Sequence, residues 1–133
     1  MAEPTLPGKV VALAQSLDQA KIPHAFGGAI ALAYYATPRA TIDIDLNVFL
    51  PPAEFERVAK SLGALGINTK VDRDALDRDG QCRVAWGRTP VDLFMANVEF
   101  HEEMARHTRK QPFADTTIRV LAPEQLMVCK AMF

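Results

Sequence analysis

The 133-residue chain has few cysteines, no long apolar run and almost no net charge. Its two cysteines, Cys82 and Cys129, form no CxxC pair, which argues against a disulfide framework and indicates a reduced compartment. No apolar run approaches the length of a membrane span, and the N-terminus lacks a basic region followed by an apolar one. We therefore expect a cytoplasmic protein that has no membrane association.

The formal net charge of −1 argues against a protein that coats nucleic acid, because nonspecific affinity comes from neutralising phosphates. The basic stretch of Arg106, His107, Arg109 and Lys110 is expected to be a solvated helix end, with an RNA contact as the alternative. The composition, 49% apolar and 23% charged, is ordinary for a globular protein. The length suits one domain over residues 1–133.

Hydrophobic spacing and turn residues predict an α/β (α+β) fold, a small mixed sheet with helices chiefly on one face. Helices are expected over 6–21, 29–35 and 99–107, and from Pro123 to the chain end. Another helix is expected to begin at Pro51-Pro52, with a core face of Phe55, Val58, Ala59 and Leu62. Strands are expected over 24–26, 42–49, 82–86, 91–95 and 117–121, and Gly66-Ile67 is expected to lead into another. A turn over 87–90 is expected to join the strands over 82–86 and 91–95.

The strand expected over 42–49 carries two aspartates at positions i and i+2. Side chains alternate across a strand, so Ile42, Ile44, Leu46 and Val48 share one face while Asp43, Asp45 and Asn47 share the other. Burial of the apolar face presents both aspartates together. Carboxylates roughly 6 Å apart repel by about 2–3 kcal/mol at an effective dielectric near 20. The pair therefore indicates half of a divalent-metal site.

Three companions strengthen this interpretation. Gly27-Gly28 lies at a predicted strand-to-helix junction, where backbone N–H groups and a helix N-terminus suit phosphate oxygens. Arg39 and Thr41 supply a cation and a hydroxyl just before the pair. Asp92 lies on another apolar strand, where a charge is costly without a partner. Three carboxylates on one sheet face suit two Mg²⁺ ions in phosphoryl or nucleotidyl transfer.

These motifs, Gly-Gly-Ala at 27–29, Arg-x-Thr-x-Asp-Ile-Asp-Leu and a later Val-Asp-Leu-Phe, resemble the DNA polymerase β-type nucleotidyltransferase superfamily. The chain is most similar to stand-alone bacterial enzymes, the abortive-infection (AbiEii/AbiGii-like) toxins and the small antibiotic nucleotidyltransferases. The resemblance covers residues 24–50 and Asp92, and more weakly 121–130, where Lys130 matches a lysine that approaches the nucleotide. It departs from the superfamily's usual Gly-Ser, since Gly27-Gly28 stands there.

The resemblance implies a palm-like core and transfer of a nucleoside monophosphate from an NTP to an acceptor hydroxyl. Asp43, Asp45 and Asp92 would be catalytic and bind two Mg²⁺ ions, with Mn²⁺ as a substitute. Gly27, Gly28, Arg39, Thr41 and Lys130 would contact the nucleotide, the two glycines cradling its phosphates through backbone N–H groups. The acceptor would be an RNA or tRNA end in a toxin–antitoxin or phage-defence role, or a small hydroxylated molecule.

A rival hypothesis comes from the C-terminal residues 126–133, which form an apolar helical pattern without a capping residue. Either the chain is cut short there, which we favour, or a partner or second copy covers that helix. The second case describes a catalytically silent or partner-dependent module with a nucleotidyltransferase fold that acts through protein association.

Other motifs are weaker. The acidic segment 72–80 lacks apolar alternation and the glycine position of a calcium loop, so a flexible, solvated turn is expected there. His101 and His107 fall on different faces of the helix expected over 99–107, which argues against zinc. No Walker loop, GxGxxG or GxSxG motif is present.

Overall fold

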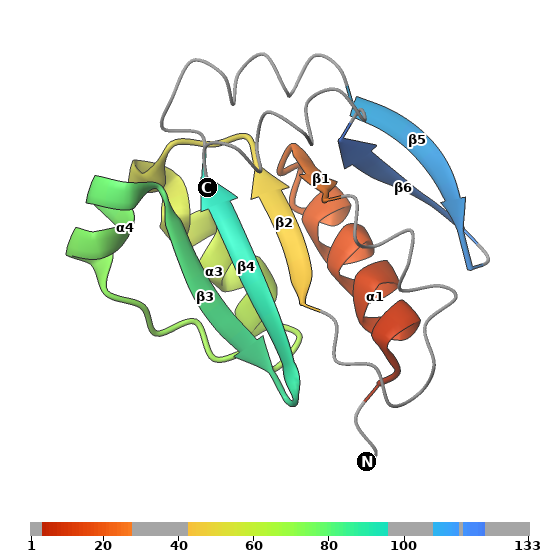
Figure 1. Cartoon of the computed structure of the whole chain (residues 1–133), viewed down its shortest axis with the longest axis horizontal. Helices are drawn as coiled ribbons and strands as arrows, with labels where there is room; N and C mark the ends of the chain where they lie inside the picture. Colours follow the sequence, from red (N-terminus) through yellow and green to blue (C-terminus); the bar gives the residue numbers. More distant parts are fainter. Residues whose placement is uncertain (1–3, 28–42, 96–107, 115, 122–133) are drawn as a thin grey trace.

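A computed structural model describes residues 4–27, 43–95, 108–114 and 116–121, which form a six-stranded sheet with three α-helices (Figure 1). The strands, in chain order, are β1 His24–Phe26, β2 Ile44–Val48, β3 Gln81–Trp86, β4 Thr89–Met95, β5 Thr108–Phe113 and β6 Thr116–Leu121. Their order across the sheet is β3-β4-β2-β1-β6-β5. The β2–β4 and β1–β6 pairs are parallel and the other three pairs antiparallel, so the predicted mixed α+β fold is confirmed.

Helix α1, Leu6–Gln19, begins where the sequence supplies a cap. The Thr5 hydroxyl accepts a hydrogen bond from the Gly8 N–H at 3.2 Å, and a proline stands in the first turn. Its buried stripe is Lys9, Val10, Leu13, Ala14 and Leu17. Four of these five residues are apolar and anchor the helix to the core, and the fifth is the buried Lys9.

One face of the sheet carries the core. Ile44, Leu46 and Val48 of β2 are fully buried and belong to one apolar cluster with the buried residues of α1 and α3. Helix α3, Phe55–Gly63, follows a short 3₁₀ turn, Pro52–Glu54, and buries Phe55, Val58 and Leu62, with Ala59 partly buried. The predicted burial of Ile44, Leu46 and Val48 and the predicted core face of α3 are therefore confirmed, while Ile42 lies outside the described residues.

The flexible turn expected over 72–80 is wrong, because residues Arg73–Asp79 form helix α4. The Asp72 carboxylate caps its first turn by accepting from the Ala75 N–H at 3.1 Å, and Gly80 ends it at a φ of 70°. Leu76 is fully buried and fixes the helix to the core. These local signals are visible in the sequence, but a single apolar residue gives no periodicity.

Three smaller expectations also fail. In the described residues that follow Gly66-Ile67 no strand forms, and an isolated bridge joins Asn68 to Ala85 instead. The turn expected over 87–90 is shorter, because Thr89 and Pro90 already pair with β3. Arg109 and Lys110 belong to strand β5 rather than to a helix end.

The helices expected over 29–35, over 99–107 and from Pro123 lie outside the described residues. Among the helices that are described, none is long and apolar enough to cross a membrane.

Candidate active site

The parallel pairing of β2 with β4 brings two of the expected carboxylates side by side. Asp45 is the register partner of Asp92, and Asp43 stands directly before the first residue of β2. Neighbouring strands lie about 4.8 Å apart and paired residues share a face, so the two side chains leave the sheet together. The Asp92 side chain is 21% exposed and that of Asp43 is 40% exposed. The site is therefore open to solvent but partly shielded.

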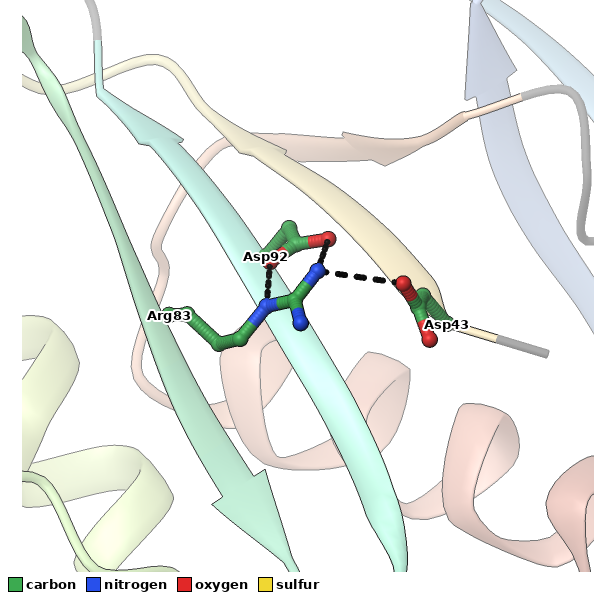
Figure 2. Close-up of polar contacts among 3 residues, drawn as sticks. All are labelled: Asp43, Arg83 and Asp92. Atoms are coloured by element: carbon green, nitrogen blue, oxygen red, sulfur yellow. Dashed lines mark hydrogen bonds and ion pairs between the residues drawn. The ribbon is translucent and has the colours of Figure 1, made fainter. Parts of the chain in front are cut away.

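Arg83 of β3 joins two of these carboxylates (Figure 2). Its Nε donates to Asp92 Oδ1 at 2.6 Å and its Nη2 donates to Asp92 Oδ2 at 3.1 Å, a bidentate pair. The same Nη2 also donates to Asp43 Oδ2 at 3.1 Å. The hydrogen bonds to Asp92, and then the negative charges of Asp92, Asp43 and Asp45, raise the pKa of the Arg83 guanidinium.

The position of Arg83 follows from the β3–β4 hairpin. Strand β3 ends at Trp86, β4 begins at Thr89, and these two residues pair across a two-residue loop in which Gly87 has a φ of 60°. Counting back from that loop places Arg83 opposite Asp92, as the structure shows. Sequence reasoning missed Arg83, although a two-residue turn at Gly87-Arg88 would have revealed the pair.

Gly27 follows β1 and packs against Asp45. Its N–H donates to the Asp45 carbonyl oxygen at 2.8 Å. A β-carbon on Gly27 would lie 2.8 Å from the Asp45 Cβ and 3.4 Å from its Oδ2, so glycine is required by close approach. This differs from the expected phosphate cradle, because the Gly27 N–H is already used by Asp45.

Asn47 continues the polar side of β2 beyond Asp45. Its side chain is 2% exposed, and among the described residues its buried Oδ1 has no hydrogen-bond donor. A buried amide oxygen without a partner is unusual. It adds a second kind of side-chain oxygen acceptor, an amide carbonyl, to the face that carries the aspartates.

The expected metal can be tested against these donors. In the described ranges 4–27, 43–95, 108–114 and 116–121, no three acidic, histidine or cysteine side chains gather closely enough to hold a metal ion as they stand. Arg83 lies between two of the candidate ligands, Asp43 and Asp92. The donor set itself consists of carboxylate oxygens, which Mg²⁺ and Mn²⁺ prefer. In chemistry the donor set therefore suits such an ion, while in the structure Arg83 holds two of its members, Asp43 and Asp92.

A hollow of about 350 Å³ adjoins the site and is lined by Gln81, Cys82, Arg83, Asp92, Leu93 and Phe94. Burial, and then the charge of Asp92, raise the pKa of the Cys82 thiol to about 11. The thiol is therefore neutral at physiological pH and is no nucleophile there. The hollow offers polar and apolar walls beside the carboxylates.

The remaining predicted contacts cannot be placed. Gly28, Arg39, Thr41 and Lys130 lie outside the described residues. The structure thus brings together Asp43, Asp45, Asp92 and Gly27, and adds Arg83 to them.

A scan against protein-family models found no match, and a search of curated protein sequences found none either.

Proposed function

We propose that this protein is a metal-dependent nucleotidyltransferase, which moves a nucleoside monophosphate from an NTP to an acceptor hydroxyl and releases pyrophosphate. One observation carries the proposal. Asp45 and Asp92 are register partners on adjacent parallel strands, and Asp43 is joined to Asp92 through Arg83. The charge of Arg83 is shared among these three carboxylates, and the remaining negative charge supports a cationic ligand.

The roles follow from position. Asp43, Asp45 and Asp92 would hold Mg²⁺, which when bound neutralises phosphate charge and polarises the α-phosphate. Asp92 also lies beside the hollow and would accept the proton of the acceptor hydroxyl. The acceptor oxygen then bonds to the α-phosphorus, while the bond between that phosphorus and the pyrophosphate oxygen breaks. Gly27 holds Asp45 in place by its close packing.

The nucleotide contacts proposed for Gly28, Arg39, Thr41 and Lys130 extend this site. Since the Gly27 N–H is bonded within the sheet, the phosphate cradle would begin at Gly28. The acceptor would be an RNA or tRNA end, or a small hydroxylated molecule. A cytoplasmic toxin–antitoxin or phage-defence role belongs to the first case, and the exposed side chains of Arg109 and Lys110 offer phosphate contacts for it.

Calorimetric titration of each NTP with Mg²⁺ tests the proposal. Wild type should bind at least one NTP in a Mg²⁺-dependent manner, and Asp45→Asn and Asp92→Asn should reduce that binding at least tenfold. Asp77→Asn is the matched control, because it removes the same charge from an exposed position on α4.

Two results would count against the proposal. Equal binding by wild type and Asp45→Asn would place the nucleotide elsewhere. If wild type bound no NTP but its molecular mass in solution rose with protein concentration, the chain would be self-associating. The protein would then be the non-catalytic association module instead.

A further inference from the structure

Arg83 occupies the space between two of the proposed metal ligands. We propose that Arg83 is a positioning residue that competes with the divalent cation for Asp43 and Asp92 and must release Asp43 when the cation binds. The proposal rests on the proposed function, because it takes these carboxylates as ligands. It assigns a role to a residue outside the motifs that define the site in the sequence.

The distances make the two cations mutually exclusive. Arg83 Nη2 lies 3.1 Å from Asp43 Oδ2 and 3.1 Å from Asp92 Oδ2. A Mg²⁺ ion held by these two carboxylates would need the lone pairs that Nη2 now uses, and its ligand distance of about 2.1 Å is shorter than either contact of Nη2. The guanidinium must leave before the ion can take both oxygens, since two positive groups cannot use the same lone pairs.

The exposure of the three side chains makes the exchange feasible. The Arg83 side chain is 61% exposed, so most of it already faces the solvent into which it would move. Exposed ion pairs are weak because water screens them. Asp92 is the less exposed carboxylate and makes the bidentate contact, so the single bond to Asp43 is the easier one to lose.

The Arg83 guanidinium also stabilises the carboxylate cluster in the metal-free protein. Asp43, Asp45 and Asp92 repel one another in the metal-free protein, and the charge of Arg83 offsets that repulsion while its fork fixes Asp92. The carboxylates therefore stay gathered on one face. The cost is a lower apparent affinity for the metal, because each binding event displaces a resident cation.

Titration of the metal-free protein with Mn²⁺ alone, followed by calorimetry, tests this competition. Arg83→Gln should bind Mn²⁺ about two- to fivefold more tightly than wild type, the range expected from an exposed ion pair. Arg78→Gln is the matched control. It removes the same charge from an arginine that is 71% exposed and bonded to Asp79 on α4, and it should bind as wild type does.

A second readout uses thermal unfolding and the variant Arg83→Lys, which keeps the charge but loses the fork. Without metal, Arg83→Gln should melt below wild type, and Mn²⁺ should raise its melting temperature by more than it raises that of wild type. Arg83→Lys should fall between them in both respects.

The outcomes separate the two proposals. If wild type binds Mn²⁺ but Arg83→Gln binds it equally or more weakly, the competition is refuted and the metal site stands. If Arg78→Gln gains as much affinity as Arg83→Gln, the effect is one of net charge and the competition is refuted as well. If neither wild type nor Arg83→Gln binds Mn²⁺, both proposals fail together.

Discussion

Gly27 packs so closely on Asp45 that no side chain fits between them: a β-carbon on Gly27 would lie 2.8 Å from the Asp45 Cβ. The Asp45 Cβ is attached directly to the backbone of β2, which pairs with β1, so this atom has little freedom to move. The glycine therefore fixes the distance between the end of β1 and the proposed ligand Asp45.

Gly27→Ala should displace Asp45 and destabilise the protein by roughly 1–3 kcal/mol, the usual cost of overpacking. Urea unfolding followed by circular dichroism measures the stability, and Mn²⁺ calorimetry measures the site. Gly63→Ala is the control, because a β-carbon at Gly63 meets nothing within 4 Å. If Gly27→Ala kept the stability and Mn²⁺ affinity of wild type, the close packing of Gly27 on Asp45 would contribute to neither.

Lys9 joins helix α1 to the β3–β4 hairpin. It is 1% exposed, and its Nζ donates to the Trp86 carbonyl oxygen and to Thr89 Oγ1, each at 2.8 Å. The ammonium also lies 5.9 Å from the centre of the Trp86 ring. This amine anchors the turn of the hairpin whose register sets Arg83 opposite Asp92.

Lys9→Met keeps the length of the side chain but removes its donors, so it should destabilise the fold by about 1–3 kcal/mol. The midpoint of urea unfolding gives the comparison. Lys60→Met, at an exposed position of α3, should change stability by no more than about 0.5 kcal/mol. An equal response from the two lysines would show that the buried contacts of Lys9 contribute nothing.

The Cys82 thiol, with its pKa raised to about 11, should react slowly with alkylating agents. At pH 8 its thiolate is scarce, so iodoacetamide should modify it on the order of a hundredfold more slowly than an ordinary thiol with a pKa of about 8.5. A Cys129→Ser background leaves Cys82 as the single reporter, and the same protein unfolded in urea is the reference. If the alkylation rate plotted against pH had the same midpoint in the folded and unfolded protein, the raised pKa of Cys82 would be contradicted.

His24 should make stability depend on pH in the acidic range. Burial lowers its pKa, opposed by the hydrogen bond between Nδ1 and the Ile22 carbonyl oxygen at 2.9 Å and by Asp18, and aided by Arg119. The unfolded histidine gains its proton near pH 6.5 and the folded one only at lower pH. The stabilising contribution is therefore complete above about pH 6.5 and is lost as pH falls through the folded pKa.

Thermal melts at pH 7.5 and pH 5.0 measure this effect. Wild type should lose more stability between the two values than His24→Gln, which has no titrating ring. Parallel losses in the two proteins would assign the acid sensitivity to other groups.

Much of the fold was predictable because it depends on local patterns. Alternation in residues 43–48 and helical spacing in 55–62 each place apolar side chains on one face, and burial then leaves a single consistent orientation. Helix α4 was missed although Asp72 and Gly80 mark its ends, because one buried leucine and many charges gave no period to detect.

For the site, the sequence by itself determined that Asp43 and Asp45 share a face, since a strand turns alternate side chains the same way. The pairing of Arg83 with Asp92 was missed, because the turn expected over 87–90 is longer than the two-residue loop that sets the register of this hairpin. Only the tertiary structure decided that Asp45 lies beside Asp92 and that Arg83 reaches Asp43, 40 residues away in the chain. Those contacts depend on the parallel pairing of β2 with β4, whose order and register are set by burial of the whole core rather than by any local signal.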